Sequence, residues 1–243
     1  MSQDLKKYAV IVAGGSGVRM GTSVPKQFLL LQGKPVLWHT LRVFLTAYDD
    51  LEIVLVLPAE HLETGRALVS GMGAPDRIRL VAGGATRYHS VRNGLQLIRD
   101  GLPATGDGLP ATAADPVIFV HDGVRCLVSK ELVYRCYEQA LRLGSAIPVV
   151  DCRDSVRIDN KAVDRNRVKL VQTPQTFLSS LLLSSYQAEY REAFTDEATV
   201  VEAAGHPVYL VEGETANIKI TTPEDLVIAE KMMEGVVSIG AGG

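Results

Sequence analysis

The chain has 243 residues, of which 22% are charged, and a formal net charge of −3 at pH 7. This length suits a single α/β domain, residues 1–243, with a large hydrophobic core. The charge balance gives no basic patch that would favour nucleic acid, and no apolar run reaches the length needed to span a membrane.

The first predicted element is a buried strand over residues 8–13, a short apolar run rich in β-branched residues. Gly14, Gly15 and Gly17 follow at its end. Glycine tolerates positive φ and has no Cβ, so the backbone can turn sharply and approach a ligand closely. Successive backbone N–H groups in such a turn form a concavity that suits phosphate.

Two cations, Arg19 and Lys26, lie in the same stretch and favour a triphosphate over a neutral ligand. A glycine turn without a ligand would explain neither cation. A P-loop is excluded, because no glycine is followed by Lys-Ser or Lys-Thr. The dinucleotide fingerprint fails, because Met20 occupies its third glycine position, and this weakens the alternative of an NAD-linked oxidoreductase.

Helical and strand patterns alternate after this stretch. Apolar spacing predicts a helix over 36–48, a strand over 51–57, a helix over 61–72 and a strand over 78–81. This alternation indicates an α/β fold with a mostly parallel sheet and helices on both faces. In such sheets ligands bind beyond the carboxyl ends of the strands, where the glycine turn lies.

A second glycine turn, Gly83 and Gly84, follows a predicted strand and precedes a helical stretch over 91–98. Arg87 and Ser90, at the start of that helix, are placed to reach a base or a ribose. Ser90 is equally well placed to be a helix N-cap. The two roles are compatible.

A buried strand that begins at Val117 ends in His121 and Asp122. A carboxylate at the end of a strand, near a triphosphate, is placed to hold Mg²⁺, which takes one or two carboxylates together with phosphates. The alternative is that Asp122 orders the turn and pairs with Arg125. We expect His121 to be a structural neighbour of Asp122.

Two segments interrupt the alternation. Gly-Leu-Pro-Ala-Thr occurs at 101–105 and again at 108–112, which predicts an exposed loop with no assigned function. After a helix over 129–143 and a strand over 146–150, residues 151–169 are polar and charged and predict a protruding hairpin. Most of its cations are expected to face solvent. A protruding arm usually packs against another structural unit, and we expect this one to pack against another subunit.

The remaining chain predicts further helices and strands. Helices are expected over 181–193 and 196–203, strands over 209–211 and 217–220, and a last helix from 223 to about 235. Thr195 and Asp196 provide an N-cap for the helix over 196–203. Residues from 238 onward are expected to be disordered.

The cysteines and histidines indicate a cytoplasmic protein without a zinc site. Three cysteines include no C-x-x-C pair, and five histidines include no H-x-x-x-H pair. An odd cysteine count, with no apolar signal-peptide core in the first seven residues, fits the reducing cytosol.

Several motifs occur in the order that one enzyme family shows. They are residues 13–21 with Pro25-Lys26-Gln27, Gly83-Gly84 with Arg87 and Ser90, Val120-His121-Asp122, Gln172-Thr173-Pro174-Gln175, Thr195-Asp196, and Asn217-Ile218-Lys219-Ile220-Thr221. Over residues 8–232 the set resembles the 2-C-methyl-D-erythritol 4-phosphate cytidylyltransferases.

The resemblance implies a reaction of CTP with 2-C-methyl-D-erythritol 4-phosphate that gives 4-diphosphocytidyl-2-C-methyl-D-erythritol and pyrophosphate, in the non-mevalonate isoprenoid pathway. It further implies a Rossmann-like fold, Mg²⁺ dependence, and a homodimer in which the arm at about 145–170 reaches the partner's active site. The alternatives are a ribitol-5-phosphate cytidylyltransferase, whose motifs overlap, and a non-catalytic nucleotide-binding regulator on the same fold.

The resemblance also implies roles for individual residues. The positions that hold the triphosphate and the α-phosphate are Arg19, Lys26 and Lys219. Nucleotide-binding positions match Ala13, Gly14, Gly15, Gly17, Gly83, Arg87 and Ser90. Asp122 matches the carboxylate near metal and substrate, and Arg165 the arm arginine that binds the substrate phosphate across the dimer. Thr173 and Thr195 match positions that line the polyol-phosphate site.

Overall fold

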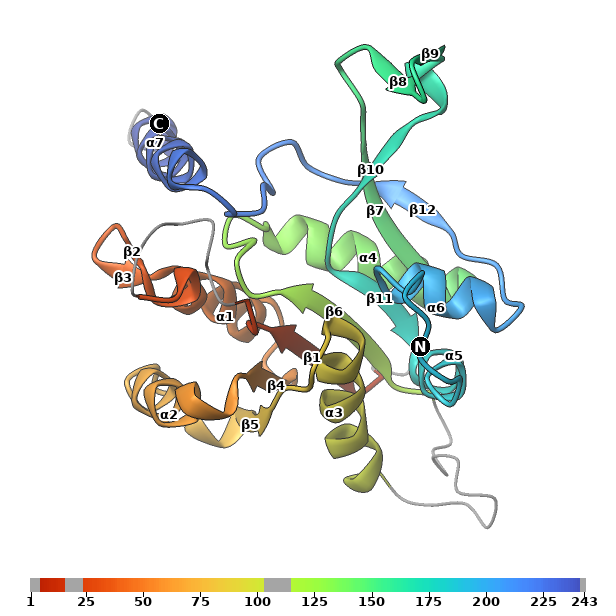
Figure 1. Ribbon diagram of the computed structural model, residues 1–243. Coiled ribbons are helices and arrows are strands. Elements are labelled where there is room, and N and C mark those ends of the chain that lie inside the picture. Colours follow the sequence, from red (N-terminus) through yellow and green to blue (C-terminus); the bar gives the residue numbers. More distant parts are fainter. Residues whose placement is uncertain (1–4, 16–23, 103–114, 241–243) are drawn as a thin grey trace.

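The structure is a computed structural model that describes residues 5–15, 24–102 and 115–240 (Figure 1). Gly17, Arg19 and most of the duplicated loop lie outside these described residues. Within them, no helix combines the length and the hydrophobicity that crossing a membrane requires.

Four parallel strands form one half of the central sheet, in the order β6-β1-β4-β5. They are β1 (Lys7–Val12), β4 (Glu52–Leu57), β5 (Ile78–Ala82) and β6 (Val117–Asp122). The first, second and last of these are almost wholly buried, as their continuous apolar sequences predict. Because the chain leaves β1 toward β4 and later returns as β6 on its other side, the carboxyl ends of β1 and β6 form a topological switch point, where such sheets bind ligands.

The other half of the sheet contains the antiparallel pairings. It comprises β7 (Ser145–Asp151), β10 (Lys169–Val171), β11 (Gln175–Leu178) and β12 (Leu210–Glu212). Strand β11 lies antiparallel between β6 and β7, β10 is antiparallel to β7, and β12 is parallel to β7. A two-stranded hairpin, β8 (Val156–Ile158) and β9 (Lys161–Val163), protrudes at the top of Figure 1. The prediction of a protruding arm is confirmed.

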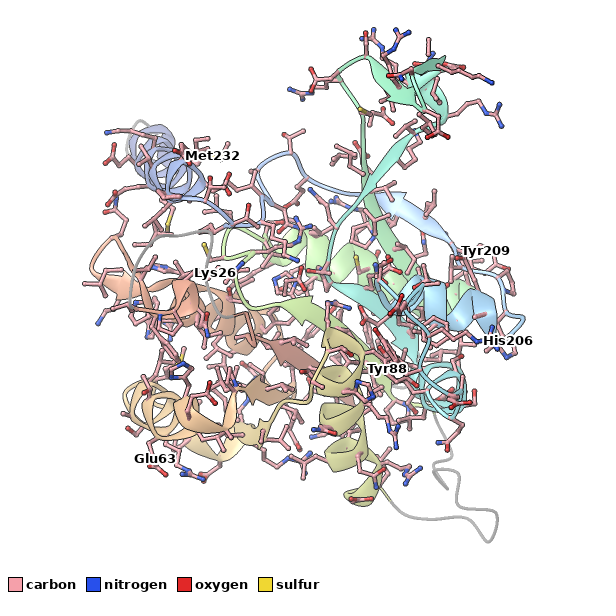
Figure 2. The ribbon with its side chains drawn as sticks, viewed as in Figure 1. Lys26, Glu63, Tyr88, His206, Tyr209 and Met232 are labelled. Atoms are coloured by element: carbon pink, nitrogen blue, oxygen red, sulfur yellow. The ribbon has the colours of Figure 1, made fainter. Side chains whose placement is uncertain are left out.

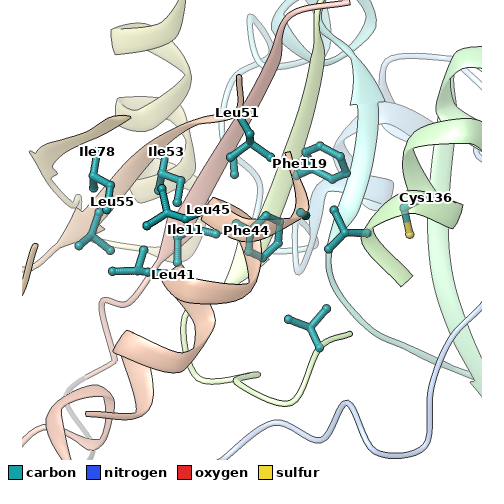
Figure 3. Close-up of a cluster of buried hydrophobic side chains, with 14 of the residues drawn as sticks. Ile11, Leu41, Phe44, Leu45, Leu51, Ile53, Leu55, Ile78, Phe119 and Cys136 are labelled. Atoms are coloured by element: carbon teal, nitrogen blue, oxygen red, sulfur yellow. The ribbon is translucent and has the colours of Figure 1, made fainter. Parts of the chain in front are cut away.

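Helices cover both faces of the sheet, as predicted. On one face lie α1 (Val36–Ala47), α2 (Leu62–Ser70) and α4 (Lys130–Leu143), and on the other α3 (Arg87–Asp100), α5 (Ser179–Ser185) and α6 (Glu197–Ala203). Alternate residues of β1 serve the two layers, so Ile11 packs with Phe44 and Phe119 on the first face (Figure 3), while Val10 packs on the second.

A third, smaller cluster holds the C-terminal helix α7 (Pro223–Gly240) against the body. It includes Ile220, Val124 and Ala229, all buried. Two short strands, β2 (Leu30–Leu31) and β3 (Lys34–Pro35), and 3₁₀ turns at Lys26–Phe28, Ala59–His61, Pro75–Arg77 and Arg165–Arg167 complete the described elements.

Three predicted elements are wrong. The helix over 181–193 stops at Ser185, because Tyr186 turns in to stack on Tyr88 with ring centroids 4.8 Å apart. Residues 217–220 form no strand. The last helix continues past Gly235 to Gly240, since a single glycine costs a helix only about 1 kcal/mol relative to alanine.

Candidate active site

A pocket of about 310 Å³ opens at the switch point of the sheet. It is lined by the turn after β1, the start of α3, the end of β6 and the segment before α7. The predicted site residues that it brings together are Ala13, Gly14, Gly15, Lys26, Arg87, Ser90, Asp122 and Lys219. Residues from both halves of the chain therefore converge on one cavity.

The turn after β1 is fixed from two sides. The Ala13 N–H donates to the Val56 carbonyl over 2.9 Å, and the buried Gln27 donates through Nε2 to the Ala13 carbonyl over 2.9 Å. A Cβ on Gly15 would lie 3.3 Å from Cε of Lys26, so the missing side chain leaves room for the lysine. Lys26 is 9% exposed and lies well inside the outline of the molecule, unlike Glu63 or His206 (Figure 2). Gln27 belongs to the quoted motif, but its role in fixing the turn is found only in the structure.

The second glycine turn is ordered by Ser90. The Ser90 hydroxyl accepts from the Gly84 N–H over 3.1 Å and donates to the Thr86 carbonyl over 3.0 Å. The N-cap of α3 is Thr86, so the interpretation of Ser90 as the cap is wrong, and the helix begins earlier than predicted. Gly84 lines the pocket, whereas Gly83 does not; a Cβ on Gly83 would come within 2.9 Å of Ser90 Oγ.

Asp122 lies at the centre of three cations. Its Oδ1 is 3.2 Å from Nε of Arg87, and its Oδ2 is 2.9 Å from Nζ of Lys219 and 3.6 Å from Nε of Arg125. Burial by itself would raise the pKa of Asp122, but these cations outweigh it and hold the pKa well below its usual range. The carboxyl group is therefore ionised throughout the physiological range, and the expected pairing with Arg125 is present.

Arg87 is committed to two carboxylates. Its Nη1 and Nη2 donate to the two carboxylate oxygens of Glu197 over 2.6 and 3.0 Å, in addition to the contact with Asp122. Glu197 is fully buried and also accepts from the Tyr186 hydroxyl over 3.2 Å. Burial favours a lower pKa for Arg87, but the two carboxylates prevail and raise it. Most of the guanidinium is therefore already bound to carboxylates, and its role in the pocket is to form part of the wall.

Glu197 is a residue that the sequence did not reveal. An acid directly after an N-cap predicts an exposed first turn that interacts with the helix dipole. Its burial depends on Arg87, which is 110 positions away in the chain. No local pattern carries that information.

His121 is held in one neutral form. Its Nε2 lies 3.1 Å from the Arg125 carbonyl, which can only accept, so Nε2 carries the proton. Its Nδ1 then accepts from the Thr173 hydroxyl over 2.9 Å, and that oxygen accepts from the Asp122 N–H over 3.1 Å. Burial lowers the pKa of His121 to about 3. The expectation that His121 is a structural neighbour of Asp122 is confirmed.

A second pocket, of about 200 Å³, adjoins the first and shares Arg87, Asp122 and Lys219 with it. Thr173 and Thr195, predicted to line a substrate site, both lie along this second pocket. The shared wall carries two cations and one carboxylate. This arrangement suits two phosphorylated ligands whose phosphates meet at the wall.

Arg165, predicted to bind the substrate phosphate, lies on the arm and lines neither of the two pockets. It lies in the 3₁₀ turn of the arm, where it is exposed, and its Nη1 donates to the Arg153 carbonyl over 2.9 Å. Figure 1 shows the arm projecting from the body. A single chain therefore does not place Arg165 in the site.

The metal expectation can be compared with the donor groups present. In the part of the chain that the structure describes, no three His, Cys, Asp or Glu side chains gather as a metal cluster. Asp122 is the acidic residue that lines the first pocket, and both its oxygens face cations. These residues fit a Mg²⁺ that is held chiefly by phosphate oxygens with a single carboxylate, and they do not fit an all-protein site.

Comparison with known proteins agrees with this geometry. A family model described as 2-C-methyl-D-erythritol 4-phosphate cytidylyltransferase matches residues 8–235. A relative of that name from Bacteroides fragilis is 45% identical over 229 residues, which covers 93% of this chain and 98% of the relative. The crystal structure of the enzyme from Thermus thermophilus is 32% identical with a TM-score of 0.68, covering 93% of this chain and 98% of that one. A 4-diphosphocytidyl-2C-methyl-D-erythritol synthase from Anaerococcus prevotii is 28% identical with a TM-score of 0.73, covering 93% and 97%.

Proposed function

The chain belongs to the 2-C-methyl-D-erythritol 4-phosphate cytidylyltransferase family, and we propose that its two adjoining pockets hold the two substrates of that reaction. It is a nucleotidyltransferase of isoprenoid biosynthesis that joins CTP and 2-C-methyl-D-erythritol 4-phosphate to form 4-diphosphocytidyl-2-C-methyl-D-erythritol and pyrophosphate. The observation that carries the placement is the wall of Arg87, Asp122 and Lys219 that the two pockets share.

The chemistry is a direct displacement. An oxygen of the substrate phosphate attacks the α-phosphorus of CTP in line, the new P–O bond forms, and the bond to pyrophosphate breaks. The attacking phosphate has a second pKa of about 6, so it is already ionised at neutral pH and needs no general base. This fits the state of His121, which is neutral, buried and engaged at both ring nitrogens.

The protein supplies position and charge. We assign Lys26, together with Arg19, to the leaving pyrophosphate, and Lys219 to the α-phosphate and the incoming phosphate. Preorganised cations that face charge developing in the transition state account for much of enzymatic rate enhancement. The ionised Asp122 holds Lys219 in place at 2.9 Å, so the ammonium group does not have to be ordered during the reaction.

The proposal includes Mg²⁺ bound mainly by the triphosphate, with Asp122 as the carboxylate beside it. When bound there, the ion would neutralise charge on the leaving pyrophosphate. Among the described residues that line the first pocket, Asp122 is the acidic one, so it would be the protein's carboxylate ligand to the ion.

We also propose that the enzyme is a cytoplasmic homodimer in which each arm delivers Arg165 to the partner's second pocket. The distance of the arm from the chain's own pockets supports this arrangement. So do the exposed apolar side chains on the arm and its base, Ile158, Leu170 and Leu210, which are 60%, 49% and 52% exposed. Three free thiols, two of them buried, fit a reducing compartment.

Pyrophosphate release from CTP and Mg²⁺ tests the choice of acceptor. One reaction receives 2-C-methyl-D-erythritol 4-phosphate and a parallel one ribitol 5-phosphate at the same concentration. We expect release with the first alone. Release with ribitol 5-phosphate alone would move the enzyme to the related polyol, and release with neither would favour a nucleotide-binding regulator.

A further inference from the structure

Lys219 lies on an irregular segment between the end of β12 at Glu212 and the start of α7 at Pro223. Neither a helix nor a sheet ladder positions it. Its Nζ is nevertheless held 2.9 Å from Oδ2 of Asp122. Whatever fixes this segment also fixes a group that we assign to the reaction.

The side-chain amide of Gln172 makes the pair of hydrogen bonds to this segment that a neighbouring strand would otherwise make. Its Oε1 accepts from the Glu214 N–H over 3.1 Å, and its Nε2 donates to the Glu214 carbonyl over 2.7 Å. Two strands exchange the same pair of bonds through their backbones. The Gln172 backbone N–H donates to the Pro148 carbonyl over 2.8 Å, so the amide projects from a residue anchored on β7.

Asn217 forms the second attachment, two residues before Lys219. It is fully buried, its Nδ2 donates to the Thr173 carbonyl over 2.8 Å, and its own carbonyl accepts from Nη1 of Arg125 over 2.8 Å. The Thr173 hydroxyl in turn accepts from the Asp122 N–H. Residues 172–173 thus hold both the strand end that carries Asp122 and the segment that carries Lys219.

The segment is also fixed on the other side of Lys219. Ile220 is fully buried, and its N–H donates to the Val124 carbonyl over 3.0 Å. The amide of Gln172 fits here because residue 213 is a glycine. A Cβ on Gly213 would lie 2.5 Å from Oε1 of Gln172. Lys219 therefore lies between two fixed residues, and only its side chain retains freedom.

We propose that Gln172 and Asn217 are positioning residues for cytidylyl transfer, which set Lys219 against Asp122 at the wall between the two pockets. This inference rests on the proposed role of Lys219. It goes further in assigning the position of that lysine to two amides that hold its backbone segment, one of which, Gln172, also lines the second pocket. Misplacement of a reacting group by about 1 Å can cost a factor of about 10² in rate.

A double-mutant cycle in steady-state kinetics tests the proposal, with CTP and 2-C-methyl-D-erythritol 4-phosphate as substrates. The variants are Gln172→Leu, Lys219→Ala and the two combined. Gln139→Leu is the matched control, because Nε2 of Gln139 also donates to backbone carbonyls, those of Tyr209 and Leu210 at the start of β12, before the segment that carries Lys219. Thermal unfolding of each variant separates lost stability from lost rate.

We expect Gln172→Leu to lower kcat by about 10- to 100-fold, with little change in the KM for CTP, and to have no further effect on kcat when Lys219 is already alanine. Gln139→Leu lowers the melting temperature and leaves kcat unchanged. An equal loss of kcat from Gln172→Leu in both backgrounds would overturn the inference. If Lys219→Ala alone leaves kcat unchanged, the proposed role of Lys219 fails, and the inference fails with it. Should Gln172→Leu not fold, Gln172→Glu, which keeps the acceptor for Glu214, enters the same cycle.

Discussion

Nζ of Lys219 lies 2.9 Å from Oδ2 of Asp122, although the two residues come from a late irregular segment and a central strand. Both residues line both pockets, so this ion pair lies in the wall that the pockets share. A carboxylate that shares its charge among Lys219, Arg87 and Arg125 is a poor general base. Its effect is to hold cations at the wall where we propose that the phosphates meet, which agrees with a reaction that needs positioned charge and no proton transfer.

Folding stability should depend on pH through His121. Its pKa is lowered to about 3 in the folded chain, from about 6.5 in the unfolded one, so the unfolded state binds the proton more readily. Stability is therefore fully present above about pH 6.5 and is lost as the pH falls toward 3, by about 2 kcal/mol between pH 7 and pH 5. Asp122 acts in the same direction, but only below its unfolded pKa of about 3.8.

Urea unfolding at pH 7 and pH 5 measures this loss. The variant His121→Gln should show a shallower dependence on pH than the wild type. His206→Gln, at an exposed histidine, should leave the dependence unchanged. Equal slopes for the wild type and His121→Gln would refute the assignment.

The buried pair of Arg87 and Glu197 should contribute strongly to stability. Glu197→Gln removes the charge from a fully buried group and leaves Arg87 with Asp122 alone, which should lower the free energy of unfolding by about 3 kcal/mol. Denaturant titration measures the change. Glu202→Gln, on the exposed side of the same helix, should change it by less than about 0.5 kcal/mol. A small effect at Glu197 would mean that the pair is dispensable for the fold.

Hybrid dimers test the role of the arm. A dimer of one Lys26→Ala chain and one Arg165→Ala chain has one site with both residues intact, so equal mixing should restore about a quarter of wild-type activity. Refolding the two variants together and assaying pyrophosphate release checks this. The control mixes Lys26→Ala with Lys219→Ala, which damages every site and should restore nothing. Absence of rescue in the first mixture would place Arg165 outside the shared site.

The stereochemistry at phosphorus tests the single displacement. The substrate is a CTP analogue in which sulfur replaces one non-bridging oxygen of the α-phosphate, prepared as a single stereoisomer. The product should have the inverted configuration at phosphorus, because the attack is in line and occurs once. Phosphorus NMR of the product distinguishes the two isomers. Retention would require a covalent enzyme intermediate and would contradict the mechanism.

The sequence predicts the parts of this site that are local. The strand at 8–13 and its glycine turn, the strand that ends at Asp122, and the protruding hairpin all follow from short-range pattern and composition. Resemblance to a family adds Lys219, which no local rule selects. The pocket confirms that the glycine turn, Asp122 and Lys219 converge.

What the sequence misses depends on contacts between distant residues. Ser90 and Thr86 are equally good caps by type, and the choice of Thr86 is set by the bond between Ser90 and Gly84. Residues 217–220 look like a strand, yet isolated bonds to distant residues fix them, from Nδ2 of Asn217 to the Thr173 carbonyl and from the Ile220 N–H to the Val124 carbonyl. Glu197 is buried because Arg87 is there to pair with it. Local periodicity contains none of these relationships.

Pyrophosphate release by Lys26→Ala and Lys219→Ala, beside the wild type, tests most directly whether this pocket performs the transfer. Each variant removes a preorganised charge, so we expect kcat with 2-C-methyl-D-erythritol 4-phosphate to fall by about 10²-fold or more. Lys34→Ala and Lys231→Ala remove exposed lysines that line neither pocket and should retain wild-type rates. Wild-type kinetics in both pocket variants would contradict the account.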